Sequence, residues 1–473
     1  MRRALLLLAS LAALPGPAWG TPQDSSLAGA LEELARGLRD AEAGILVRSA
    51  RDGRTLFAFR AQDPFRLASN TKLFTTAAAL ALLGPEFRFR TPVGLAGEDL
   101  HVVGGGDPNI SGRFHGGNPT AVFSAWAARL RDAGVSRLRH LVLHTGIFDA
   151  ERVNPGWKSY DPAAWWAAPF GPLSLNDNCV DLRITPGPEG RPARISCSPD
   201  TAFLRLANRT RTTPRPTRPF GIAREPGSDT VLLTGDVPAR GPPLTCSVAV
   251  PDPTAYFGTV LRETLLREGI AVTGRLEETD APLEKVEGFR ELAAFESDLP
   301  RTLAACNQPS QNFYAEMILR TLGWKTRGRG TLQNGLAAVR EFLSREVGLE
   351  GVSLADGSGL TRDNLASPED VVTLLLHMLH HPHARIFLDS LPTGGLPRST
   401  LRNRLKAPDL RDRVRAKTGH LAGISALSGV AESISGETYV FSILVNGRED
   451  ALPAGIDRLQ DRFCELLVRH PDD

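Results

Sequence analysis

The chain has 473 residues, of which 42% are hydrophobic, and its 55 basic and 53 acidic side chains leave a net charge of +2. A chain of this length divides into two or three domains and has room for large cores. The near-neutral charge argues against a nucleic-acid-binding protein, and ordinary apolar content with 23% charged residues argues against wholesale disorder. The composition therefore predicts a soluble, multi-domain globular protein.

The first twenty residues have the three regions of a secretory signal peptide. Two arginines precede an apolar stretch over 4–14, and Ala18 and Gly20 stand at the −3 and −1 positions of a cut before Thr21. The apolar stretch is too short to span a bilayer comfortably, and no cysteine follows it to carry a lipid. We therefore expect cleavage after residue 20, export to the periplasm or the medium, and no membrane span in the mature chain.

The five cysteines are scattered and form no Cys-x-x-Cys pair, which excludes a zinc ribbon and a small disulfide scaffold. An oxidising destination permits disulfides, and Cys179, Cys197 and Cys246 are candidates for one bridge whose pairing stays open. Cys306 and Cys464 are expected to be free and buried.

The chain opens with short, clearly bounded elements. Apolar spacing predicts a helix over 27–41, and two strands at 44–48 and 55–59 follow around the Asp52-Gly53 turn. An Ala- and Leu-rich helix is predicted over 69–83. From about 90 to 288 the chain is rich in Gly and Pro, with short apolar stretches, and we interpret this region as inserted, mostly β modules, with 209–227 as an extended surface segment.

Helical periodicity returns in the last third of the chain, which ends on strands. We predict helices over 313–322, 331–347 and 368–380, strands at 414–417, 426–430 and 439–445, and a final helix over 454–468. The early hairpin and these late strands are expected to share one antiparallel sheet, so that the chain leaves this domain for roughly two hundred residues and returns.

Ser69-Asn70-Thr71-Lys72 is the first of three short patterns that carry chemistry. If Ser69 opens a helix, Lys72 lies one turn on, on the same face, where its amine approaches the serine oxygen. A serine hydroxyl becomes a nucleophile when a base takes its proton, and lysine is such a base once burial or nearby cations lower its pKa. The helix N-terminus also offers backbone N–H groups to a developing oxyanion. By itself the pattern more often marks an N-cap serine and a solvated lysine.

Two further patterns lie far downstream. Ser310-Gln311-Asn312 places a hydroxyl and an amide at alternate positions of a loop that enters a helix. Lys417-Thr418-Gly419 ends an apolar strand, where a glycine lets a substrate peptide lie alongside and the two side chains bind a carboxylate. Each alone is explained by capping or by an ordinary strand end. However, two of only six lysines in the chain fall in these patterns.

The order and setting of the three patterns resemble those of penicillin-binding proteins and serine β-lactamases, whose motifs are Ser-x-x-Lys, Ser-x-Asn and Lys-Thr-Gly. The long separation of Ser69 from Ser310 is closer to the type 4 low-molecular-mass penicillin-binding proteins, the D-alanyl-D-alanine carboxypeptidase/endopeptidase family. Four other stretches share this resemblance: 104–108, 173–178, 356–362 and Leu391-Pro392 leading to 415–419.

The resemblance implies an α/β (α+β) fold. A penicillin-binding/serine β-lactamase-like domain, an antiparallel sheet with helices on both faces, would carry inserted, mostly β domains. We place the discontinuous catalytic domain at 21–90 and 289–473, and an accessory region of two small nested β-rich domains at 91–288.

The resemblance also implies an enzyme that cuts D-Ala-D-Xaa bonds of peptidoglycan stem peptides through an acyl-serine. Ser69 would attack the carbonyl carbon and Lys72 would accept its proton. Ser310 would relay a proton to the leaving amine, and Asn312 would hold Lys72 and the substrate amide. β-Lactams would be covalent inhibitors, with no cofactor, no metal and no nucleic acid involved, and the choice between carboxypeptidase and endopeptidase stays open, as does the oligomeric state.

The substrate-binding residues implied are Lys417, Thr418, Gly419 and His420. Lys417 and Thr418 would orient the substrate carboxylate, Gly419 would leave space on the strand, and the oxyanion would meet the backbone N–H groups of Ser69 and His420. The family commonly has a small hydroxylated residue where this chain has His420, which leaves substrate preference open.

Two rival functions are a serine β-lactamase, which the large insertion argues against, and a penicillin-sensing wall-binding protein without turnover, which the intact motifs argue against. A secreted esterase is a third alternative. His377, His380, His381 and His383 form the densest histidine group, but they lack the Glu of His-Glu-x-x-His and precede a proline, so we interpret them as charges at a helix C-terminus and not as metal ligands.

Overall fold

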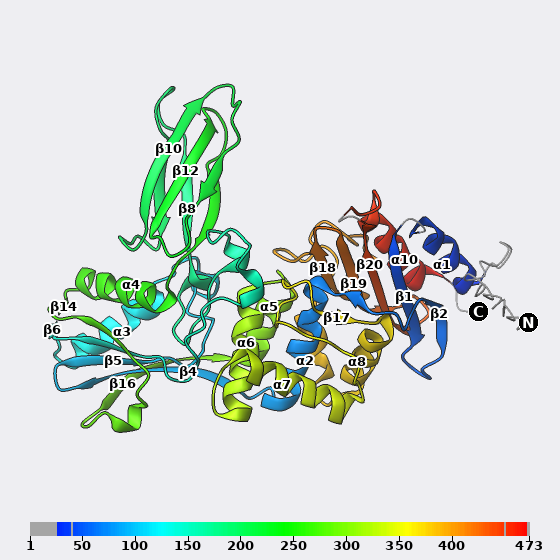
Figure 1. The fold of residues 1–473 in the computed structure, drawn as a ribbon, viewed down its shortest axis with the longest axis horizontal. Helices are drawn as coiled ribbons and strands as arrows, with labels where there is room; N and C mark the ends of the chain where they lie inside the picture. The colour runs from blue at the N-terminus through cyan, green and yellow to red at the C-terminus, as the bar shows by residue number, and fades with distance from the viewer. Residues whose placement is uncertain (1–25, 39–40, 449–450, 471–473) are drawn as a thin grey trace, which may run out of the picture.

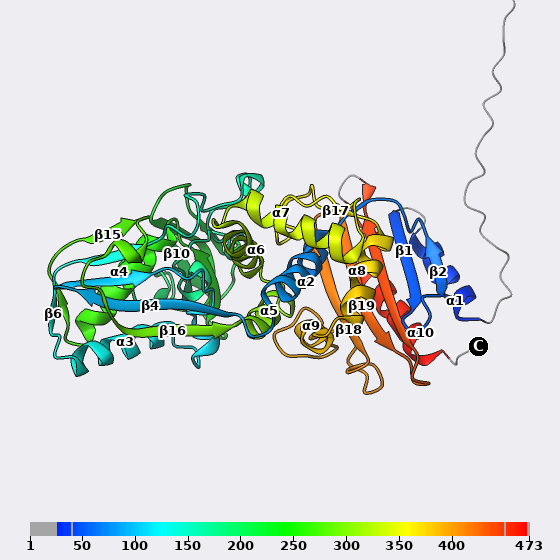
Figure 2. The same ribbon diagram turned by 90° about the horizontal axis from the view of Figure 1, so that it is seen from below.

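The computed structural model describes residues 26–38, 41–448 and 451–470, and the predicted signal peptide lies outside these residues (Figures 1 and 2). Within them, no helix is both long and apolar enough to cross a membrane. All five cysteines are free, so the candidate disulfide among Cys179, Cys197 and Cys246 does not form. Cys197 and Cys246 pair with opposite sides of Leu182 in one sheet, and a strand between them keeps the two thiols apart.

A five-stranded antiparallel sheet, in the order β18-β19-β20-β1-β2, joins the two ends of the chain as expected. Its strands are β1 (Glu42–Ser49), β2 (Thr55–Phe59), β18 (Val414–Leu421), β19 (Ile424–Glu432) and β20 (Thr438–Asn446). β19 and β20 are buried along almost their whole length because helices cover both faces of the sheet, which explains their unbroken apolar sequences. β18 forms one edge.

Helices α1 (Leu27–Ala35) and α10 (Ile456–Arg469) cover one face of this sheet, and α2 (Thr71–Leu83) and α8 (Pro368–His380) cover the other (Figure 2). The predicted helix over 27–41 ends early. After Ala35 the chain tightens into a 3₁₀ turn that contains Gly37, a residue that weakens helices by about 1 kcal/mol relative to Ala. The layered sheet with helices on both faces confirms the predicted fold class.

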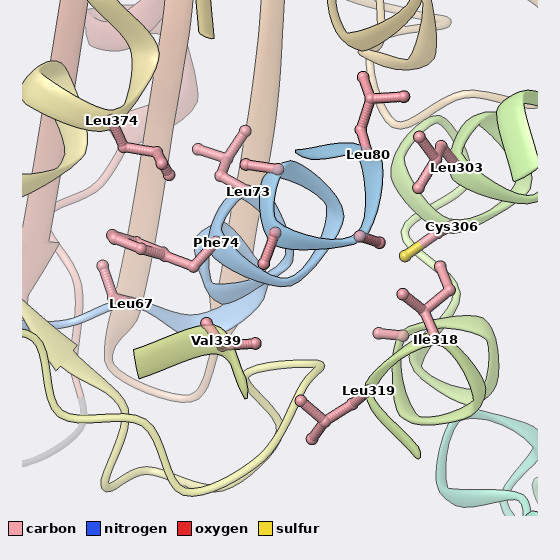
Figure 3. Packing of buried hydrophobic residues seen from close by; sticks show 14 of the residues in the cluster. Leu67, Leu73, Phe74, Leu80, Leu303, Cys306, Ile318, Leu319, Val339 and Leu374 are labelled. Carbon is pink, nitrogen blue, oxygen red and sulfur yellow. The ribbon is translucent and has the colours of Figure 1, made fainter. Parts of the chain in front are cut away.

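Helix α2 is the centre of the larger core. Figure 3 shows its side chains, Leu73, Phe74 and Leu80, between the sheet and the helices that contribute Leu303 and Ile318. These helices are α5 (Leu299–Asn307) and α6 (Asn312–Arg327), followed by α7 (Leu332–Phe342), a π turn (Leu343–Val347) and α9 (Ala384–Ser390). The helices α6, α7 and α8 are confirmed, whereas the short α5 and α9 were not predicted.

The intervening chain builds a second core. A mixed five-stranded sheet contains β15 (Leu276–Thr279), β7 (Leu141–His144), β5 (Asp99–Val103), β4 (Arg88–Ala96) and β16 (Arg290–Asp298), in that order. Two helices, α3 (Ala121–Asp132) and α4 (Pro253–Arg267), pack against it and were not predicted. The short pairs are β3 (Phe65–Arg66) with β17 (Leu365–Ala366), and β6 (Arg137–Leu138) with β14 (Ala271–Val272).

Two three-stranded sheets form the projection at the top of Figure 1. They contain β8 (Cys179–Thr185), β9 (Arg194–Ser198), β10 (Arg205–Thr213), β11 (Gly221–Ala223), β12 (Thr230–Pro238) and β13 (Leu244–Ala249). The segment 209–227 is therefore only partly the extended surface segment that we expected. Residues 209–213 belong to β10, in which Thr210 and Thr212 turn inward while Arg209 and Arg211 turn outward, and residues 221–223 form β11.

The second core gives a prediction about the independence of the insertion. Phe257 is fully buried and packs edge-on against Phe123, with ring centroids 4.8 Å apart. Phe257→Ala should destabilise this core by about 3–5 kcal/mol, and Phe74→Ala should do the same to the core around α2. Calorimetry should then resolve two melting transitions, and each variant should lower the midpoint temperature of a different one. One transition shifted equally by both would contradict separate domains.

Candidate active site

Ser69 lies in a 3₁₀ turn, Ala68–Asn70, that leads directly into α2. The turn is tight, since Ala68 has a φ of +43°. Gly359 packs directly against it with a φ of +83°, and a Cβ there would lie 1.7 Å from the Ala68 carbonyl oxygen. Only glycine fits at position 359, and its lack of a side chain allows the stretch 356–362 to pack against the turn that carries Ser69.

Lys72 is one turn along α2 from Ser69 and is fully buried. Its Nζ donates to Ser69 Oγ at 2.9 Å, to Asn312 Oδ1 at 2.7 Å and to the Ser358 carbonyl at 2.7 Å. Burial lowers the pKa of Lys72 to about 8, against the opposing influence of Cys306 and of the Asp356 and Glu316 carboxyls. With this pKa about a tenth of the Lys72 amine is neutral at pH 7, far more than for an exposed lysine.

Ser310 and Asn312 belong to the loop that enters α6, and the two side chains meet different lysines. Asn312, the first residue of α6, binds Lys72 and donates from Nδ2 to the Trp166 carbonyl at 2.8 Å. Ser310 Oγ accepts from Lys417 Nζ at 2.9 Å. Ser310 has a left-handed φ of +62°, a conformation that costs a non-glycine residue energy and that concentrates at functional sites.

Lys417, Thr418, Gly419 and His420 lie in order along the edge strand β18. Lys417 is fully buried, and burial together with the neighbouring Lys72 holds its pKa well below the usual value for lysine. Asn70 Nδ2 donates to the Lys417 carbonyl at 3.1 Å and so ties the serine turn to this strand. His420 is exposed. The structure therefore brings all eight predicted residues to one place.

A cavity of about 420 Å³ opens over Ser69, Ser310, Asn312, Thr418 and His420. Gly359 and Leu360, from the stretch 356–362 that the sequence analysis singled out, also line it, and its other walls come from residues that were not selected: Tyr160, Trp165, Trp166, Pro309, Thr400 and Leu421. Three of the six tryptophans of the chain fall within 157–166, and this concentration was the available signal. Thr400 offered no signal, although its hydroxyl accepts from Thr418 Oγ1 at 2.8 Å.

The stretch 356–362 is held by one buried carboxylate. Asp356 accepts the backbone N–H groups of Gly359 (2.6 Å) and Thr361 (2.7 Å), Trp157 Nε1 (3.0 Å) and Asn364 Nδ2 (3.0 Å). This network fixes the Ser358 carbonyl against Lys72.

Glu316 of α6 supports the same stretch from below by accepting the Gly357 N–H at 3.0 Å. Burial and the Asp356 carboxylate raise the pKa of Glu316 to about 8. Glu316 is fully buried. The four clustered histidines lie elsewhere, around the C-terminal end of α8, where His380 Nδ1 contacts the Leu376 carbonyl at 2.8 Å.

Comparison with known proteins agrees with this geometry. Residues 24–464 match the D-Ala-D-Ala carboxypeptidase 3 (S13) family. The chain belongs to this family. A D-alanyl-D-alanine carboxypeptidase of Actinomadura sp. (strain R39) is 32% identical over 450 residues, covering 90% of this chain and 82% of the relative. The D-alanyl-D-alanine carboxypeptidase DacB of Haemophilus influenzae is 26% identical over 391 residues, with 80% of each chain covered.

The fold agrees as well. The crystal structure of penicillin binding protein 4 (dacB) from Haemophilus influenzae superposes with a TM-score of 0.77 at 22% identity, covering 93% of this chain and 99% of that one. Together with the family match and the 32% identical relative, this confirms the resemblance to the type 4 low-molecular-mass penicillin-binding proteins, and the protein is a serine-type D-Ala-D-Ala carboxypeptidase.

The Asp356 network yields a stability prediction. In Asp356→Asn, either orientation of the amide turns its NH₂ group toward two of the four donors, and each unsatisfied buried group costs about 1–3 kcal/mol. We expect urea unfolding to report a loss of roughly 2–6 kcal/mol. Asp363→Asn, at an exposed carboxylate of the same segment, is the matched control. Equal stability of the two variants would show that the Asp356 carboxylate does not hold the loop.

Proposed function

We propose that this carboxypeptidase is exported, acts on the D-Ala-D-Ala end of peptidoglycan stem peptides through an acyl-serine intermediate, and is inhibited by penicillins. The observation that carries the proposal is the fully buried Lys72 amine 2.9 Å from Ser69 Oγ. A hydroxyl is a weak nucleophile without a base, and this amine is both close enough and easily deprotonated. The relatives named above are carboxypeptidases, and the Haemophilus influenzae protein is also known in complex with a β-lactam.

In the acylation step, Ser69 Oγ attacks the carbonyl carbon of the scissile bond and its proton passes to Lys72 Nζ. Asn312 Oδ1, at 2.7 Å from Nζ, keeps the amine directed at the serine, and its position beside the cavity suits contact with the substrate amide. The backbone N–H groups of Ser69 and His420 stabilise the oxyanion, a role that depends on the backbone and tolerates a histidine at this position.

The leaving amine takes its proton from Ser310 Oγ, which Lys417 Nζ contacts at 2.9 Å and can resupply. Lys417 and Thr418 orient the carboxylate of the terminal residue, and Gly419 lets the substrate backbone lie along β18. Water then hydrolyses the ester with Lys72 as the base. A penicillin acylates Ser69 in the same way but leaves slowly, so it occupies the enzyme.

Acylation of one serine is the first test. Intact-protein mass spectrometry after incubation with benzylpenicillin should find one covalent drug molecule on the wild type and none on Ser69→Ala, which removes the nucleophile but no packing of consequence. The wild type should also release D-alanine from a D-Ala-D-Ala peptide at a steady rate. A stable adduct without peptide turnover would favour a penicillin-sensing protein, and rapid loss of the adduct a β-lactamase.

The role of Lys72 gives a pH prediction. Below pH 8 the Lys72 amine is mostly protonated and has no lone pair to accept the serine proton, whereas above pH 8 it is mostly neutral. The rate constant for acylation by benzylpenicillin, measured by stopped flow, should therefore rise with pH and level off above about 8. Lys72→Met should react about 10²–10⁴ times more slowly, and its rate constant should not rise with pH in this range. An unchanged profile in this variant would assign the base elsewhere.

A further inference from the structure

A separate cavity of about 360 Å³ adjoins the one over Ser69, and Tyr160 lines both. It lies where the segment 153–170 meets the turn between β11 and β12, because residues of both line it. None of the eight motif residues lines this cavity. It is therefore distinct from the catalytic site.

Most of the wall of this cavity is apolar. Trp157 and Tyr160 contribute aromatic rings, and the aliphatic part comes from Val153, Pro162, Ala167, Pro169, Val250 and Pro251. Three charged side chains, those of Arg224, Lys158 and Asp161, also line it. A concave, mainly apolar space with a few polar groups is the usual form of a small-molecule site.

Arg224 is the unusual member of this lining. Only Arg224 and Arg320 are buried arginines among the described residues, with 6% and 0% of the residue exposed. Arg320 pairs with the carboxylates of Asp149 and Glu151, whereas Arg224 has no ion pair within the described part of the chain. Burial lowers the pKa of Arg224, yet a guanidinium stays charged at neutral pH. A buried charge without a counter-ion is unfavourable, so an anion is the missing partner.

Two backbone carbonyls hold the Arg224 guanidinium in place. Its Nη1 donates to the Ser228 carbonyl at 3.1 Å, and its Nη2 donates to the Pro162 carbonyl. Its Nε is buried without an acceptor among the described residues. An arginine has five N–H groups, so these two hydrogen bonds leave three unused. A carboxylate suits them, because its two oxygens accept a parallel pair of N–H groups from one guanidinium.

The other two charges leave the cavity positive. Lys158 is exposed and has no hydrogen bond or ion pair in the described ranges. Asp161 is the one carboxylate of the lining, and its Oδ1 accepts the Ala163 N–H at 2.8 Å. Asp161 attracts Arg224 but forms no ion pair with it. Two cations against one carboxylate favour an anionic ligand.

We propose that this cavity binds a small organic anion, a carboxylate attached to an apolar or aromatic group. Arg224 pairs with the carboxylate, and Lys158 attracts it from the exposed side. The apolar group lies against Trp157, Pro162 and Val250. The binding is non-covalent and takes place away from Ser69, so the inference does not rest on the proposed function.

The cavity is nevertheless connected to the catalytic site through its aromatic wall. Trp157 Nε1 donates to the Asp356 carboxylate at 3.0 Å, and the Tyr160 hydroxyl donates to the Leu360 carbonyl at 3.1 Å. A ligand in the cavity therefore touches two side chains that hold the stretch 356–362 in place.

Three probes test the site by isothermal titration calorimetry on the full chain. 2-Naphthoate has both the carboxylate and the apolar group, 2-naphthylmethanol lacks the charge, and acetate lacks the apolar group. We expect one molecule of 2-naphthoate to bind per chain, and each of the other two to bind about ten-fold more weakly or less. Benzylpenicillin, which is directed at the cavity over Ser69, should leave the binding of 2-naphthoate within two-fold. Loss of this binding in its presence would put the probe at the catalytic site and overturn the inference.

Variants of the two cations identify the cavity. Arg224→Gln should weaken the binding of 2-naphthoate about ten-fold and leave that of 2-naphthylmethanol within two-fold, because only the charged probe uses the guanidinium. Lys158→Gln changes an exposed side chain, so it leaves the packing intact, and it should weaken 2-naphthoate about two-fold. Lys285→Gln is the matched control, because Lys285 is an exposed lysine of the inserted region that does not line the cavity, and it should bind as the wild type does.

The melting temperature of each variant shows whether it is folded. If Arg224→Gln does not fold, the comparison of Lys158→Gln with Lys285→Gln decides. The inference is overturned if the wild type does not bind 2-naphthoate, if the two naphthyl probes bind equally well, or if the folded variants of both cations bind 2-naphthoate like the wild type.

Discussion

The site depends on one buried amine. Lys72 is withdrawn completely from water and replaces its lost hydration with three acceptors at 2.7–2.9 Å. Burial of an amine without such partners is strongly unfavourable, so the folded chain must supply all three together. They come from the turn before α2, the start of α6 and the stretch 356–362. The acceptor in α6 lies 240 residues from Lys72 in the sequence, and the acceptor in 356–362 lies 286 residues from it. Burial makes the charged form of the Lys72 amine energetically unfavourable, and for the same reason it lowers the pKa of this amine.

The region between the first two motifs contributes residues that contact the site directly. Its segment 153–170 supplies Trp157 to the Asp356 carboxylate, the Trp166 carbonyl to Asn312, and the Tyr160 hydroxyl to the Leu360 carbonyl at 3.1 Å. Each contact braces an element that positions Lys72 or walls the cavity. These three hydrogen bonds hold other elements of the site in place, so the segment supports the site by positioning those elements.

A cavity of about 290 Å³ lies between the insertion and the sheet domain, beside the cavity over Ser69 with which it shares Trp165. It is lined by Arg398 from the loop before β18 and by Arg113, Asp177 and Asp181 from the inserted region. The Asp177 carboxylate sits in a run of three left-handed residues, Asn176 to Asn178, and reaches both Arg113 and Tyr314 of α6. Asn and Asp tolerate this backbone better than most residues, which explains the sequence of the turn. The turn therefore fixes the insertion against the helix that begins at Asn312.

Local periodicity in the sequence by itself predicted the five strands of the sheet β18-β19-β20-β1-β2 and the main helices, and the resemblance of three short motifs to those of a known family gave the eight site residues. The sequence also indicated that distant segments form one sheet, since the early hairpin and late strands are both strongly apolar. It missed α3, α4, α5 and α9, whose patterns are short or interrupted, and it placed strand residues 209–213 and 221–223 in a surface segment. Tertiary structure alone decided that Cys197 and Cys246 stay apart, that Thr400 borders the site, and that Arg398 lines a cavity. These features depend on contacts between residues far apart in the chain, and no local pattern encodes such contacts.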